Sequence, residues 1–355
     1  MEHNNTGSVN FNGQHFYIGI DVHKKSWKIN IRSSGMRLKS FSADPSPELL
    51  CRHLEKNYPG GTFHIVYEAG FCGFWIQRRF HELGIDCIVV NPADVPTSHK
   101  DKERKSDAVD AGKLAHELEK GGLKPIYIPE LQLQHLRSLC RLYGSITQSS
   151  TRIKNRIKGL LAFNGVSVPD HSAHWSAAFI AHLRTIPLDN GPAKDSLDLC
   201  LDELIQHRAR KLQTIRKLRS YASSSQDYDI IRHIMSIHGI GFITAITLYT
   251  EIADMQRFHN FDKLKSYVGL VPSCHNSGDK DDTGLLTQRK NPHLRYVLIE
   301  AAWSAVGKDP VLLAAFNKLI VRMKRQEAIV RIAGKLLGRI RYVWLHDCAY
   351  PYAAA

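Results

Sequence analysis

The first third of the chain alternates short apolar runs with segments of helical spacing. The apolar runs and alternating segments predict strands at residues 16–21, 27–31, 36–41, 63–68 and 85–90. The helical spacing predicts helices at residues 45–57, 74–83 and 106–115. Because a Ser-Ser-Gly turn joins the second strand to the third, we expect an antiparallel meander first and parallel crossovers afterwards. Residues 15–128 therefore predict an α/β domain.

The middle of the chain, residues 129–225, carries two long helical patterns. In the first, apolar residues recur at steps of three and four from Leu139 to Leu160, and Asn164-Gly165 ends the pattern. The second runs from about Leu197 to Ala222 and has a basic outer face. Two such helices predict an antiparallel coiled-coil arm. An ordinary helical hairpin has the same pattern, and dimerisation or nucleic-acid contact would be functions added to it.

Residues 226–345 predict a mainly helical C-terminal domain. Near its start, Gly239-Ile240-Gly241 with apolar flanks is typical of a helix-hairpin-helix, in which a helix N-terminus offers free backbone N–H groups to a phosphate. Further helices are expected at residues 261–271 and 296–306, with a polar loop at 273–295 between them. Residues 1–14 predict a disordered lead-in, and residues 346–355 a tail.

Composition and charge narrow the classes of partner. The chain is 43% apolar and 23% charged, which is globular, and no apolar run approaches the ~20 residues that a membrane span requires. The seven cysteines form no Cys-x-x-Cys pair, so a disulfide framework or structural zinc site is not indicated, and we expect a cytoplasmic protein.

The net charge of +14 is concentrated in two segments of the chain. Residues 137–219 hold fourteen Lys/Arg against six Asp/Glu, and residues 322–341 hold seven against one, which favours a nucleic acid as partner.

Four carboxylates stand where a shared metal site would need them. Asp21 and Glu68 end predicted strands, and Asp107 and Asp110 lie in the first turn of a helix that Ser106 can cap. Taken alone, Asp21 suits a turn, and Asp107 and Asp110 suit the positive end of the helix macrodipole. Together they form an oxygen-only set that suits Mg²⁺ or Mn²⁺, the ions that assist phosphoryl transfer.

This order of carboxylates resembles the RuvC-like branch of the ribonuclease H fold, whose catalytic set is Asp-Glu-Asp-Asp. Nearly the whole chain resembles the Piv/MooV-type DEDD transposases of insertion sequences, which are serine recombinases guided by a bridge RNA. The resemblance rests on motifs at residues 19–24, 67–69, 105–111, 238–241, 269–272 and 277–278. The chain departs from the family pattern at Lys290, where a glycine usually precedes the asparagine, and in the acidic residues Asp279, Asp281 and Asp282.

The resemblance implies a RuvC-like DEDD domain in which Asp21, Glu68, Asp107 and Asp110 bind Mg²⁺ or Mn²⁺. It implies that Ser277 is the nucleophile and forms a covalent 5′-phosphoserine link with DNA. The implied partners are double-stranded donor and target DNA, a non-coding guide RNA that selects them, and further copies of the chain, as a homodimer that becomes a tetramer on DNA. The implied location is the nucleoid of a bacterium or archaeon.

Basic side chains and turn glycines supply the candidates for nucleic-acid contact. They are Lys105, Arg152, Lys154, Arg156, Lys158, Gly239, Gly241, Arg289, Lys290 and Arg295. Two other functions stay open on the residues alone. One is a RuvC-like metal-dependent junction endonuclease in which Ser277 is only a loop residue, and the other is a basic architectural protein that binds DNA or RNA without catalysis.

Overall fold

The computed structural model describes residues 10–96, 107–167, 175–188, 191–277 and 280–352, and for residues 107, 108, 273–277 and 280–285 the description covers the backbone alone. The chain divides into two compact units, Met1–Ile128 and Pro129–Ala355. Most of the predicted lead-in and the candidate Lys105 lie outside the described residues. No helix in the described ranges has both the length and the hydropathy that crossing a membrane requires.

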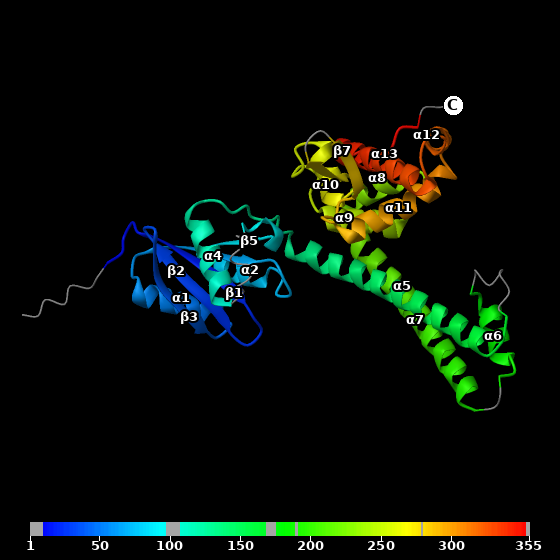
Figure 1. Ribbon diagram of the computed structural model, residues 1–355, viewed down its shortest axis with the longest axis horizontal. Helices are drawn as coiled ribbons and strands as arrows, with labels where there is room; N and C mark the ends of the chain where they lie inside the picture. Colours follow the sequence, from blue (N-terminus) through cyan, green and yellow to red (C-terminus); the bar gives the residue numbers. More distant parts are fainter. Residues whose placement is uncertain (1–9, 97–106, 168–174, 189–190, 278–279, 353–355) are drawn as a thin grey trace, which may run out of the picture. The chain divides into compact units, whose positions relative to one another are not determined.

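The first unit is built on a five-stranded sheet. Its strands are β1 (His15–Val22), β2 (Trp27–Ser33), β3 (Met36–Ala43), β4 (Thr62–Glu68) and β5 (Asp86–Val90). They lie in the order β3-β2-β1-β4-β5 (Figure 1). The strands β1, β2 and β3 pair antiparallel, whereas β4 is parallel to β1 and β5 is parallel to β4. The predicted meander followed by parallel crossovers is thus confirmed, and the layout is consistent with the expected RuvC-like domain.

Helices cover both faces of this sheet. They are α1 (Pro47–Asn57), α2 (Trp75–Glu82), α4 (Asp107–Glu119) and the short 3-10 helix η1 (Pro92–Asp94). On one face, Ile18 and Ile20 of β1 share a core with Leu54 of α1 and Phe80 of α2. On the other face, Leu114 of α4 shares a smaller core with buried valines of β4 and β5. Successive side chains of a strand point to opposite faces, so this division assigns every residue of β1 to one face or the other.

Gly19 allows α4 to lie directly on β1. A Cβ atom built on Gly19 would stand 2.1 Å from the carbonyl oxygen of Ala111 and 2.6 Å from the backbone nitrogen of Ala115. Both atoms belong to the helix backbone, which cannot yield as a flexible side chain does. The close approach therefore depends on the missing side chain, and it brings the first turn of α4 close to the sheet.

We expect Gly19→Ala to destabilise the first unit by about 1–3 kcal/mol or more, because the new methyl group overpacks the helix–strand contact. The measurement is equilibrium unfolding in urea. Gly112→Ala is the matched control, since Gly112 lies in the same helix and the nearest atom to its added Cβ, Nδ2 of Asn30, is 3.4 Å away. That change is expected to be neutral or to stabilise by up to about 1 kcal/mol. Equal stability of the two variants would contradict the assignment.

The second unit begins with the arm. Its helices α5 (Leu131–Phe163) and α7 (Pro192–Ser223) lie side by side, with α6 (Ala177–Thr185) near their tip (Figure 1). The end of α5 faces the start of α7, because Leu161 and Leu197 share one core. The start of α5 faces the end of α7, because Cys140 and Ala222 share another. The helices are therefore antiparallel.

The rest of the second unit is mostly helical. Its helices are α8 (Tyr228–Met235), α9 (Phe242–Ile252), α10 (Phe261–Val268), α11 (Pro292–Val306), α12 (Pro310–Ile320) and α13 (Arg325–His346). They enclose one large core to which α9, α11 and α13 contribute most of the fully buried side chains. The α8–α9 connection is the predicted hairpin.

The prediction of a polar loop at residues 273–295 is wrong. The chain there forms an antiparallel pair of strands, β6 (Pro272–Ser277) and β7 (Lys280–Leu286). Both strands are mainly polar in sequence, so no alternation of apolar residues marks them, and the pair is recognised from its backbone pairing. The following helix starts at Pro292 rather than at 296, because Asn291 caps it. Likewise α5 starts at Leu131 rather than at 139.

Candidate active site and nucleic-acid surfaces

Two of the predicted metal ligands lie at the carboxyl ends of neighbouring parallel strands. In the register of β1 and β4, Gly19 pairs with Val66 and Ile20 with Tyr67. The next residues along the two strands are Asp21 and Glu68. The register thus places these two carboxylates beside each other, at the edge of the sheet where loops leave the parallel strands.

Both carboxylates belong to the face that α4 covers. Asp21 lies two residues beyond Gly19, whose α-carbon contacts α4, and Glu68 lies two residues beyond Val66, which packs with Leu114 of α4. A separation of two residues along a strand returns to the same face. The sequence signal for this was the carboxylate at the end of each apolar run.

The direction of α4 brings its first turn to the same end of the sheet. Near the end of the helix, the Glu119 carboxylate accepts a hydrogen bond of 2.8 Å from Nε of Arg32, which lies opposite Tyr17 in β1. About two turns earlier, Ala111 reaches Gly19. The helix therefore runs antiparallel to β1, and the turn that holds Asp110 continues toward the level of Asp21.

The described carboxylates of this group are partly accessible. The Asp21 side chain is 23% exposed, with its Oδ2 atom 3.5 Å from Nδ1 of His23, and Glu68 and Asp110 are half-buried. The fourth carboxylate, that of Asp107, lies outside the described side chains. Among the side chains that are described, no three His, Cys, Asp or Glu groups are arranged to hold a metal ion. The donor set itself is all oxygen, which fits a hard divalent cation.

Ser277 is the last residue of β6 and pairs with Lys280 across the tip of the hairpin. Its side chain lies outside the described atoms, but its backbone position is set by the base of the hairpin. There, the backbone N–H of Thr287 donates to the carbonyl of Val271 at 3.1 Å, and Nη2 of Arg295 donates to the carbonyl of Thr287 at 2.6 Å. The candidate Arg295 therefore has a structural contact. The neighbouring candidates Arg289 and Lys290 are exposed.

The two hairpin glycines differ in what they do. Gly239 has a φ of 89°, and a Cβ there would stand 2.5 Å from the backbone nitrogen of Ala305, so the turn needs glycine for both conformation and packing. Gly241 is the N-cap residue of α9, and a Cβ there would meet nothing within 4 Å. A phosphate would fit at the side of the hairpin where Gly241 has open space, beside the backbone N–H groups of the first turn of α9.

The arm carries a cluster of cations from both of its helices. Burial lowers the pKa of Lys154, and the positive charges of Lys211, Arg208 and Lys158 lower it further. We call these four residues the basic arm surface. Sequence reasoning named Lys154 and Lys158 but missed Arg208 and Lys211, because only the antiparallel packing of α7 on α5 brings them near. Like charges held together favour the binding of a polyanion.

The other two arm candidates have different surroundings. Arg152 is exposed on α5, whereas Nη1 of Arg156 lies 3.2 Å from the Glu203 carboxylate of α7. A partner carboxylate offsets the charge of Arg156, so this residue adds less to the positive field than the basic arm surface does.

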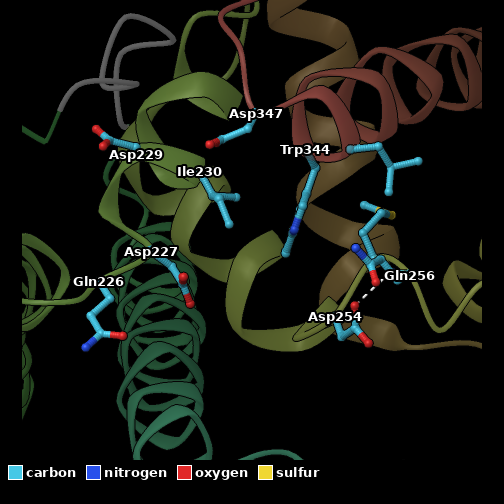
Figure 2. Close-up of a pocket in the computed structure, with 10 residues that line it drawn as sticks. Gln226, Asp227, Asp229, Ile230, Asp254, Gln256, Trp344 and Asp347 are labelled. Atoms are coloured by element: carbon cyan, nitrogen blue, oxygen red, sulfur yellow. Dashed lines mark hydrogen bonds between the residues drawn. The ribbon is translucent and has the colours of Figure 1, made fainter.

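A separate pocket of about 370 Å³ in the second unit is lined by negatively charged side chains, in contrast to the basic arm surface. Its walls include Asp227, Asp229, Asp254 and Asp347, with Trp344 on one side (Figure 2). The hydroxyl of Tyr249 donates a hydrogen bond of 2.6 Å to Asp227. Carboxylates gathered in this way repel phosphate, so this face is not assigned to nucleic-acid contact.

Family models of transposases match two parts of this chain, and the related proteins described below are transposases. A family model described as "Transposase" for IS110-type DEDD proteins matches residues 18–164, and one described as "Transposase IS116/IS110/IS902 family" matches residues 231–317. The chain is 26% identical to the "Putative transposase y4rJ" of Sinorhizobium fredii, over 90% of this chain and 89% of that one. It is 25% identical to the "Transposase for insertion sequence element IS1111A" of Coxiella burnetii, over 76% and 74% of the respective chains.

Proposed function

We propose that this chain is an insertion-sequence transposase of the IS110/IS116 type, which cuts DNA and rejoins the strands through a covalent 5′-phosphoserine intermediate. The matches to both family models support the proposal. The observation that carries the proposal is the pairing of β1 with β4, which puts Asp21 and Glu68 side by side with the first turn of α4 approaching them. A carboxylate set at the open end of a sheet suits phosphoryl transfer on an accessible DNA backbone.

Asp21, Glu68, Asp107 and Asp110 would hold Mg²⁺ or Mn²⁺. Such ions, when bound, stabilise negative charge on a phosphate under attack. The side chains that hold them serve the reaction by placing the scissile phosphate near the nucleophile. The half-buried position of Glu68 and Asp110 limits the freedom of these side chains and favours a fixed arrangement.

Ser277 is the proposed nucleophile. Its Oγ attacks the scissile phosphorus and loses its proton, the Oγ–P bond forms, and the P–O3′ bond breaks, so that a free 3′-hydroxyl leaves with a proton. A 3′-hydroxyl of a second strand then attacks the same phosphorus, the Oγ–P bond breaks, and serine regains its proton. The number of phosphate ester bonds is unchanged throughout, so rejoining needs no external energy source. Attack by water would lose that bond.

The positive charge supports nucleic acids as partners, and the family resemblance implies the guide RNA and the assembly of several copies. Donor and target DNA would lie along the hairpin before α9 and the β6–β7 strands, and a non-coding guide RNA along the basic arm surface, selecting both DNAs by base pairing. A homodimer that assembles to a tetramer on DNA would supply the carboxylates and the serine from different copies. The concentration of cations from α5 and α7 in one place supports the arm as the RNA contact.

We expect the double variant Lys154→Gln with Lys211→Gln to weaken RNA binding. Removing two cations that contact the backbone reduces the slope of log K against log salt by roughly 0.7–0.9 for each contact. The measurement is fluorescence anisotropy with labelled RNA at several salt concentrations. The control is Arg156→Gln, whose charge Glu203 already offsets, and its slope is expected to change less. An equal loss in the control would argue against a localised surface.

The experiment that tests the function uses two labelled duplexes that carry the ends of the element and its target, with the protein, its RNA and Mg²⁺. Joined products that contain both labels support the proposal. Cut ends without joined products would instead support a junction endonuclease. Binding without any cleavage would support an architectural protein.

A further inference from the structure

A buried carboxylate lies in helix α9, which is otherwise uncharged. Glu251 is 1% exposed, and a charge at such a position is costly unless hydrogen bonds compensate it. Nε and Nη2 of Arg141 donate to its two oxygens at 2.7 and 2.9 Å, and Nδ2 of Asn291 donates at 2.9 Å. Burial alone raises the pKa of Glu251, but the hydrogen bonds from Arg141 and Asn291, together with the positive charges of Arg141 and Arg137, hold that pKa below its usual range.

These partners come from three separate parts of the second unit. Arg141 belongs to the arm helix α5, Glu251 lies in the last turn of α9, and Asn291 is the N-cap residue of α11. The Oδ1 atom of Asn291 accepts the backbone N–H groups of the first turn of α11, at 3.1 and 3.2 Å, while its amide nitrogen reaches Glu251. One side chain thus fixes the start of a helix and ties it to the arm.

The same network reaches the hairpin that carries Ser277. Asn291 follows Thr287, the residue that closes the base of the β6–β7 pair, after only three intervening residues. The backbone N–H of Asn291 donates to the carbonyl of Tyr267 at 3.0 Å, and the hydroxyl of Tyr267 donates to the backbone carbonyl of Glu251 at 3.1 Å. Tyr267 lies just before the chain enters β6. Both ends of the hairpin are therefore tied to Glu251.

We propose that Glu251 is a positioning residue for strand transfer, which with Arg141 and Asn291 holds the β6–β7 hairpin in a fixed relation to the arm. This inference rests on the proposed role of Ser277. An Arg–carboxylate pair with two parallel hydrogen bonds fixes orientation as well as distance. The Glu251 carboxylate is buried, whereas the Arg141 side chain is 47% exposed. A buried charge is seldom more stabilising than an apolar residue of the same size, so the role we assign to Glu251 is to fix geometry. A displacement of about 1 Å at a reacting group can cost about 10²-fold in rate.

The test separates two roles of Asn291, its hydrogen bond to Glu251 and its cap on α11. Serine is a good N-cap residue but is too short to reach Glu251, so Asn291→Ser keeps the cap and removes the tie. Asn260→Ser is the matched control, because Asn260 caps α10 in the same way, with Oδ1 accepting the N–H of Lys263 at 2.9 Å. At saturating DNA and RNA, we expect covalent adduct to form about 10²-fold more slowly with Asn291→Ser, and at the wild-type rate with Asn260→Ser. DNA affinity is expected to stay within about twofold in both.

A second readout needs no catalysis. Amide hydrogen exchange in strands β6 and β7 is expected to be at least about tenfold faster in Asn291→Ser than in Asn260→Ser. Equal exchange, or a wild-type rate of adduct formation in Asn291→Ser, would overturn the inference. If the wild-type chain forms no serine adduct, the proposed function fails, and the exchange difference still decides whether Glu251 fixes the hairpin. Arg141→Lys, which keeps the charge but loses the paired hydrogen bonds, should resemble Asn291→Ser.

Discussion

Asp21→Asn is expected to lower the rate of DNA cleavage by about 10³-fold or more while the protein stays folded. The change removes the charge of one carboxylate that would hold a divalent ion, and such an ion contributes several kcal/mol to charge stabilisation at 1.36 kcal/mol per tenfold in rate. The assay follows single-turnover cleavage of labelled DNA with Mg²⁺. Titration with Mn²⁺ gives a second readout, and weaker ion binding is expected in the variant.

The matched control for this change is Asp86→Asn. Asp86 begins β5 at the opposite end of the sheet, where it accepts a hydrogen bond of 3.2 Å from the His64 ring. Its loss is expected to leave cleavage within about twofold, in the range of surface substitutions. Full cleavage by both Asp21→Asn and Glu68→Gln would refute the metal site and favour a protein that binds without catalysis.

Ser277→Ala is expected to abolish the covalent protein–DNA adduct and strand joining, with DNA binding retained. The methyl group cannot attack phosphorus, so no bond between protein and DNA can form. The adduct is measured by denaturing gel electrophoresis of radiolabelled DNA, and binding by anisotropy. Because the covalent link stores the phosphate ester for rejoining, joining should fall together with the adduct.

Ser273→Ala provides the control, since Ser273 lies in the same strand β6. It is expected to form adduct at close to the wild-type rate. Continued cleavage by Ser277→Ala, with water in place of serine, would favour the junction endonuclease over the transposase mechanism. Retained joining in that variant would exclude Ser277 as the nucleophile.

The pattern of apolar residues alone was sufficient to predict the strands and the main helices of the first unit. Runs of alternating or continuous apolar residues set the strands, and the carboxylates at the ends of two runs indicated Asp21 and Glu68 as neighbours once the strands are parallel. The two long helices of the arm were also predicted, because their apolar spacing persists over many turns, although α5 begins earlier than expected and α6 was not predicted. In each case the burial of one face imposes a period on the sequence, and the period can be read without knowing the partner.

Only the tertiary structure decided the contacts between distant elements. The β6–β7 pair was not predicted, because its polar sequence has no apolar period and the pairing is a backbone interaction. Arg208 and Lys211 join Lys154 only through the packing of α7 on α5, and Arg141 meets Glu251 across 110 residues. Periodicity reports which side of an element is buried, but not which other element covers it. The sequence therefore determined the elements and the order of the carboxylates, while packing decided which charges meet and what holds the serine hairpin in place.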